Sequence, residues 1–254
     1  MNKAYVAQYA RVEREHWWFR VRSEIILQEI RKAIPTQQKL RILNVGAAAG
    51  ASTEWLQSLG DVVSAEPDPA FLERLQELGF NPVQASVTSL PFETGSFDLV
   101  CALDVIEHVE HDQAAVNELL RVCRAGGAVV LTVPAFQSLW SPHDVVNHHF
   151  RRYRMREVIQ LVRNAPDAQV IRSTYFNSLL FILVWCVRRW QQWMDKNRNT
   201  ADFEEFGTGG WMNRCAGWLF SKEILLLRRM RFPVGISCFL LARKIAKHEE
   251  CNAA

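Results

Sequence analysis

The chain has 254 residues, of which 49% are hydrophobic and 22% charged, with a formal net charge of +3. These values exclude a disordered chain and imply no general affinity for nucleic acid, and the length suffices for one large α/β domain or two small ones. The six cysteines form no C-x-x-C pair and the N-terminus has no apolar signal region, so we expect reduced thiols in a cytoplasmic protein.

Strand-like and helix-like segments alternate between residues 41 and 175, after a helical lead-in at 1–40 built on EREHWWFRVRSEIILQEI. Helical periodicity separates the apolar runs RILNV, VVSAE, FDLVCAL, GGAVVLTVP and AQVIRSTYF. The first helix is expected to end before Gly60, and the second to begin after the Asp68 cap. This alternation predicts a doubly wound α/β domain with a mostly parallel sheet, whose ligands lie beyond the carboxyl ends of the strands.

The pattern changes after residue 175. Residues 176–232 are apolar and aromatic and divided by a polar loop at 197–210, which predicts a mostly helical insertion. A last core strand is expected within 233–246, followed by a polar tail at 247–254. No apolar run reaches the ~20 residues of a membrane-spanning helix.

The first strand leads into a loop of small residues, VGAAAG, and a second strand ends at Glu66. A carboxylate at that place can accept hydrogen bonds from both ribose hydroxyls of an adenosine cofactor. A dinucleotide loop of the form G-x-G-x-x-G would also need glycine at positions 48 and 51, where this chain has alanine. The sequence therefore argues against a nicotinamide-dependent reductase.

The pattern Gly46-x-x-x-Gly50 resembles motif I of the class I S-adenosylmethionine-dependent methyltransferases. SVTSLPFETGSFDLVCALDVIEHVEHD is similar to the family's run through the third and fourth strands. RVCRAGGAVVLTVP is similar to its entry to the fifth strand, with Ala125 in place of proline. The resemblance covers roughly residues 10–175 and 233–244, and it implies a seven-stranded Rossmann-like sheet with an N-terminal helical lid.

The resemblance also implies S-adenosylmethionine as the cofactor. The backbone at Gly46 and Gly50 would lie against its methionyl part, and Glu66 would hold the ribose. Asn44 and Ser86 each occupy a position where the family usually has aspartate. The other positions assigned to the cofactor are Ala48, Pro67, Ser86, Val87, Leu103, Asp104 and, on the lead-in helix, Arg22. The alternative for that helix is that it only packs on the sheet.

The acceptor side is predicted from histidines. PHDVVNHHFRRY resembles an HD…H-x-R-R-Y block that a subset of the family carries where substrate loops lie. We predict His149 or His108 as base or substrate orienter, because the ordinary pKa of histidine is near neutral. Further catalytic candidates are Asp104, His143 and Tyr153. The alternatives are a loop-bracing network of His143, Asp144 and His149 and a turn-shaping role for His108. The spacing fits no standard zinc pattern, so no metal is expected.

The expected reaction is methyl transfer to a small or lipid-like acceptor, without nucleic acid as a partner. Apolar runs edged by arginine and tryptophan, such as Leu179–Val187 before Arg188, suit peripheral contact with anionic lipid at the inner face of a membrane. A helical cap or dimer surface is the alternative. The rival function is a catalytically weak or inactive cofactor-binding scaffold, which Asn44, Ala48 and Ser86 would favour.

Overall fold

The computed structural model describes residues 3–35, 38–165, 167–182, 184–186, 189 and 211–246. Its strands are β1 (Leu40–Val45), β2 (Gly60–Glu66), β3 (Val83–Gln84), β4 (Phe97–Leu103), β5 (Cys123–Pro134), β6 (Ala168–Phe176) and β7 (Ser237–Lys244). Its helices are α1 (Lys3–Glu15), α2 (Trp17–Ala33), α3 (Ala51–Leu56), α4 (Pro69–Glu77), η1 (Ile106–His108), α5 (Asp112–Val122), η2 (Gln137–Leu139), α6 (Pro142–Val146), α7 (Met155–Asn164) and α10 (Trp211–Leu227).

The strands form one seven-stranded sheet in the order β3-β2-β1-β4-β5-β7-β6. The first five pair in parallel, whereas β7 lies antiparallel between β5 and β6. The predicted doubly wound, mostly parallel sheet is therefore confirmed. The strand order reverses between β1 and β4, and ligands of open α/β sheets bind at the carboxyl ends of the strands near such a point.

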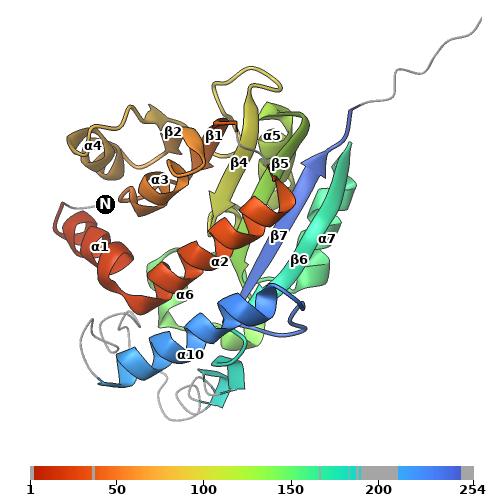
Figure 1. The fold of residues 1–254 in the computed structure, drawn as a ribbon. Coiled ribbons are helices and arrows are strands. Elements are labelled where there is room, and N and C mark those ends of the chain that lie inside the picture. The colour runs from red at the N-terminus through yellow and green to blue at the C-terminus, as the bar shows by residue number, and fades with distance from the viewer. Residues whose placement is uncertain are drawn as a thin grey trace, which may run out of the picture.

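Each face of the sheet packs against its own set of helices (Figure 1). Side chains alternate along β4: Leu99 and Cys101 lie in the core under α2 and α10, and Val100 and Ala102 lie in the core under α5 and α7. This alternation follows from the two-residue period of a strand, and burial on both faces explains the continuous apolar run FDLVCAL.

The structure corrects the expectation for Gly60 and confirms the one for Asp68. Gly60 does not end a helix: α3 ends at Leu56, and Gly60 is the first residue of β2. A Cβ at Gly60 would lie 2.0 Å from the Leu40 carbonyl oxygen, so close strand pairing requires glycine there. Asp68 caps α4 as expected, since its side chain accepts a hydrogen bond from the backbone N–H of Ala70.

The insertion after β6 contains α10, which lies alongside α2 (Figure 1). The predicted polar loop at 197–210 and the tail at 247–254 lie outside the described residues. Parts of the apolar run Leu179–Val187 also lie outside them. Over the part of the chain that the structure describes, no helix has the length and apolar character needed to cross a bilayer.

Candidate functional site

Backbone strain gathers where the strands end. Ala48 follows β1 with a φ of 45°, Asp104 follows β4 with 58°, and Phe136 follows β5 with 56°. His148, in the loop beside the same edge, has a φ of 56°. Left-handed conformations cost a non-glycine residue free energy and cluster at ligand-binding and catalytic sites. These residues mark the carboxyl edge of the sheet as the candidate site.

The loop between β1 and α3 contains the two glycines of the predicted cofactor motif. Gly46 has a φ of 67°, and a Cβ there would lie 2.6 Å from the Cγ2 of Val105. Gly50 has a φ of 94°, and a Cβ there would lie 3.1 Å from side-chain atoms of Leu75 and Leu78. The positive φ favours glycine at both positions, and at Gly46 the close contact with Val105 also leaves no room for a side chain.

Glu66 ends β2 beside this loop. Its Oε2 accepts a hydrogen bond from the backbone N–H of Ala48 at 2.9 Å, and its Oε1 accepts one from Asp68 at 3.1 Å. The residue is buried, and this burial raises the pKa of its carboxyl group. Glu66 thus fixes the loop conformation, and each oxygen keeps further acceptor capacity for a ligand hydroxyl.

The other cofactor candidates lie around this pair. The Asn44 amide donates to Ser52 and Thr53, which ties β1 to α3. The Pro67 carbonyl accepts from Gln84, and the Ser86 hydroxyl pairs with Thr88. The Val87 side chain is buried in the core. Asn44 therefore joins β1 to α3, and Val87 packs in the core. Neither contact could be read from the place of these residues in the sequence.

Arg22 of α2 meets Asp104 at the end of β4. The Nη2 of Arg22 lies 2.8 Å from an Asp104 carboxylate oxygen and donates to the Thr132 hydroxyl at 2.9 Å. Thr132 in turn donates to the other Asp104 oxygen at 2.9 Å. Leu103, the residue before Asp104, is buried. Thr132 was missed, although a polar residue inside the apolar strand GGAVVLTVP was a visible signal.

His149 is held by a buried carboxylate. Its Nδ1 lies 2.8 Å from Oδ1 of Asp144, whose side chain is 0% exposed. Arg152 binds both oxygens of that carboxylate, each at 2.8 Å. The Asp144 carboxyl group keeps a strongly lowered pKa because the hydrogen bonds from His149 and Arg152 outweigh the effect of burial. Asp144 and Arg152 together fix the orientation of the His149 ring. Because Asp144 is bonded to Nδ1, the other ring nitrogen, Nε2, is directed away from this carboxylate.

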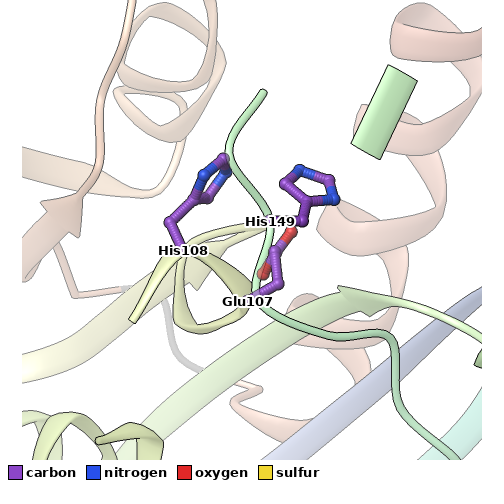
Figure 2. Close-up of side chains that lie close together, drawn as sticks. All are labelled: Glu107, His108 and His149. Atoms are coloured by element: carbon purple, nitrogen blue, oxygen red, sulfur yellow. The ribbon is translucent and has the colours of Figure 1, made fainter. Parts of the chain in front are cut away.

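His108 and Glu107, both in η1, lie against His149. The rings of His108 and His149 meet edge-to-face with centroids 4.5 Å apart. Figure 2 shows the two rings on neighbouring segments. Desolvation, and then the neighbouring His149, lower the pKa of His108 to about 4. The Phe150 N–H donates to the Glu107 carbonyl at 2.8 Å, which joins the two segments. Glu107 is completely buried, and desolvation raises the pKa of its carboxyl group well above its ordinary value.

The remaining catalytic candidates lie farther from this centre. The His143 ring centroid is 6.0 Å from that of His149, and its Nδ1 lies 3.2 Å from the Asn147 amide. The Tyr153 side chain is buried below η1, and its hydroxyl lies 3.2 Å from the Ile106 carbonyl and 3.0 Å from Asp112. The Tyr153 hydroxyl is thus engaged with η1 and with the start of α5.

Helix α1 covers the edge of the site. Val6 and Ala10 pack against Ala49 and Phe71, and Tyr9 meets the Phe71 ring edge-to-face. The Tyr5 hydroxyl donates to Asn147 at 3.2 Å, which links α1 to the end of α6. The sequence predicted a lid on the lead-in helices but did not identify these contacts, because they join segments that are distant in the chain.

Comparison with known proteins bears on this arrangement. Residues 43–131 match a family model described as a methyltransferase domain. The chain is 32% identical over 126 residues to a methyltransferase of Mycolicibacterium gilvum, covering 47% of this chain and 49% of the relative. It is 31% identical over 134 residues to a demethylmenaquinone methyltransferase of Beutenbergia cavernae, covering 50% and 54%. The chain therefore spans about half the length of the curated relatives it matches.

A solved structure shares the fold. An S-adenosylmethionine-dependent methyltransferase of Thermotoga maritima superposes with a TM-score of 0.56 at 15% identity, covering 95% of this chain and 97% of that chain. The chain thus has the Rossmann-like methyltransferase fold. The match at 43–131 and the fold together imply S-adenosylmethionine as the cofactor.

Proposed function

We propose that this chain transfers a methyl group from S-adenosylmethionine to a small or lipid-like acceptor. The observation that carries the proposal is the shared strand edge. There the motif I loop and Glu66 flank the Arg22–Asp104 pair on one side, and the oriented His149 lies on the other. A methyltransferase-domain match over residues 43–131 supports the same reading.

The residues of the loop side fit the cofactor chemically. Glu66 supplies a carboxylate for the ribose hydroxyls, and Gly46 keeps the loop backbone bare. The Nε of Arg22 is a buried donor without a partner among the described residues, and the cofactor's carboxylate would satisfy it. S-adenosylmethionine supplies a methyl group that its sulfonium already activates, so this chain needs mainly to position the acceptor.

His149 is the residue proposed to orient the acceptor. Asp144 and Arg152 hold it in place, and its side chain is 7% exposed, so its ring is largely shielded. We expect His149→Ala to lower turnover by about 10²-fold or more with the true acceptor, in the range of a lost acid–base or orienting group. His143→Ala is the matched comparison and should cost less. Unchanged turnover in His149→Ala would remove this assignment.

Calorimetry with S-adenosylmethionine and with its demethylated product tests cofactor binding before the acceptor is known. Binding of both supports the enzyme, and binding of neither supports the rival scaffold reading. Incubation with methyl-labelled S-adenosylmethionine and either a total lipid extract or a polar extract, followed by mass spectrometry, identifies the acceptor. Gly46→Val, which should not bind the cofactor, is the blank for labelled products.

An exposed apolar face supports a lipid-like acceptor. We define it by the exposed side chains Leu179, Ile182, Trp185, Trp218, Leu225 and Leu226. Leu179 lies beside α10, since its N–H donates to Glu223 at 2.7 Å. Arg228, Arg229 and Arg231 follow α10 in the chain, as suits contact with anionic headgroups. The relative from Beutenbergia cavernae bears the name of an enzyme for demethylmenaquinone.

Liposome flotation tests this face. The protein should float with anionic vesicles and less with neutral phosphatidylcholine vesicles. Trp218→Ser together with Leu225→Ser should reduce flotation, whereas Glu24→Gln on the exposed side of α2 should not. Failure of the intact protein to bind anionic vesicles would remove membrane contact while leaving methyl transfer to a soluble acceptor.

A further inference from the structure

Three potential metal ligands converge at the acceptor side of the site. One donor atom each from Glu107, His108 and His149 lies within 4.8 Å of the others. Figure 2 shows the Glu107 side chain directed toward His149, with the His108 ring beside them. Glu107 and His108 come from η1 and His149 from the loop after α6, so the fold itself assembles the set.

Glu107 supplies the observation that points to a cation. Its side chain is 0% exposed, and both carboxylate oxygens lack a hydrogen-bond partner among the described residues. Burying even an amide or hydroxyl without a hydrogen bond costs roughly 2–7 kcal/mol, and an ionised carboxylate costs far more. Such a group is rarely retained in a core without a ligand that repays the cost.

His149 has the outer contacts typical of a metal-binding histidine. Its Nδ1 is bonded to Asp144, and two hydrogen bonds from Arg152 fix that carboxylate. Carboxylates that accept the second ring N–H of a ligating histidine set its tautomer and orientation. The Nε2 of His149 is thereby the ring nitrogen left to coordinate an ion.

We propose that Glu107, His108 and His149 bind one divalent transition-metal ion. Two imidazoles and one carboxylate form a donor set used for zinc and for iron(II), with further positions open to water or substrate. Donor atoms on one tetrahedral ion at bonds of ~2.1 Å lie about 3.4 Å apart, so side-chain shifts of about 1–1.5 Å would complete the site. No metal was expected from the sequence, because the spacing of its histidines and aspartates fits no standard zinc pattern. His149 lies about forty residues after Glu107 and His108 in the chain.

The ion would select the acceptor, and this step rests on the proposed methyl transfer. An acceptor hydroxyl at the open position would be polarised by the ion and its pKa would fall, so that its proton could pass to solvent. The oxygen–carbon bond then forms while the carbon–sulfur bond of the sulfonium breaks and its electron pair remains on sulfur. The acceptor class that this site favours is therefore an alcohol or phenol, methylated at oxygen.

Cobalt(II) is the probe for the site, because its visible absorption reports coordination without cofactor or acceptor. Metal-stripped full-length protein should bind one equivalent, and Glu107→Gln and His108→Ala should each weaken binding by at least about tenfold. Asp144→Asn should weaken it by about 10–100-fold, as outer-shell changes do. His111→Ala, an exposed histidine at the start of α5, should leave cobalt affinity unchanged.

The outcomes separate the proposals. Equal cobalt affinity in wild type and Glu107→Gln, or an equal loss in His111→Ala, would overturn the metal site. Glu107→Gln keeps the shape of the side chain, and its thermal unfolding and S-adenosylmethionine affinity should match those of the wild type. Cofactor binding without cobalt binding overturns only the metal site, whereas cobalt binding without cofactor binding overturns only the proposed function.

Discussion

Ala48 shows how one residue in the site is constrained. It has a φ of 45°, and its N–H donates to Glu66. The hydrogen bond holds alanine in a conformation that glycine adopts without strain. The alanines of the loop are therefore compatible with its conformation. Gly46 and Gly50 occupy the two places with a positive φ and tight contacts, and a Cβ at Gly46 would clash with Val105.

Ala48→Gly should keep S-adenosylmethionine affinity and change the free energy of unfolding by less than about 1 kcal/mol. Relief of strain offsets the larger entropy of the unfolded chain. Gly46→Val should abolish binding, because the new side chain meets Val105 at a strained φ. Calorimetry on both variants checks the pair. Unchanged affinity in Gly46→Val would show that the loop is not part of the site.

Arg22→Met should lower S-adenosylmethionine affinity by at least about tenfold, which matches the loss of one hydrogen bond to a charged group. It should also destabilise the fold by about 2 kcal/mol, because Asp104 and Thr132 lose their shared partner. Arg20→Met, on the exposed face of the same helix, is the control. A loss of stability with full cofactor affinity would assign Arg22 a structural role alone.

At the scale of elements, α10 is anchored by a buried acid. Glu223 is 0% exposed, its Oε1 accepts the Leu179 N–H at 2.7 Å, and its other oxygen has no partner among the described residues. Burial raises the pKa of this carboxyl group to about 7. We therefore expect the attachment of α10 to the core to depend on pH.

Glu223→Gln should flatten the pH dependence of stability. The native carboxyl group keeps its proton up to a pKa of about 7, whereas the unfolded chain loses it near 4.3. The free energy of unfolding of the wild type should therefore fall as pH rises through this window. Removing the group should reduce that fall by on the order of 3 kcal/mol. Urea unfolding between pH 4 and 8 measures it.

Glu24→Gln, an exposed substitution on α2, is the matched control for this comparison and should leave the pH dependence unchanged. An identical pH dependence in the wild type and Glu223→Gln would contradict the prediction.

At the scale of the whole molecule, the last strand completes the sheet. β7 pairs with β5 on one side and β6 on the other, so it joins β6 to the parallel strands. Phe239 of β7 is 0% exposed and belongs to the core under α2 and α10. β7 thus joins β6 to the parallel strands of the sheet by hydrogen bonds, and it packs against α2 and α10 through the core on one face.

Phe239→Ala should lower the free energy of unfolding by about 3–5 kcal/mol, the usual cost of removing a buried phenylalanine. Val234→Ala, at a side chain that is 41% exposed, should change it by less than about 0.5 kcal/mol. Urea titration followed by circular dichroism compares the two. Equal effects would show that β7 does not contribute as the structure indicates.

The sequence by itself determined the architecture. Apolar runs with helical segments between them require a parallel sheet covered on both faces, and the strand ends then share one edge. Local signals such as the Asp68 cap and the Gly46 loop were readable because they act between neighbouring residues. Gly60 was misread because its constraint comes from the backbone of Leu40, on the neighbouring strand.

Only the tertiary structure decided the chemistry of the site. His108 and His149 were both predicted. No local signal in the sequence indicated that their rings meet or that Asp144 orients one of them. Nor did it indicate that the buried Glu107 carboxyl group lies beside them with no hydrogen-bond partner among the described residues. The same holds for Thr132, whose hydroxyl accepts from Arg22, and for Tyr153, whose buried hydroxyl contacts the Ile106 carbonyl and Asp112. Periodicity reports which way a side chain faces, whereas contacts between distant segments depend on the packing of the whole chain.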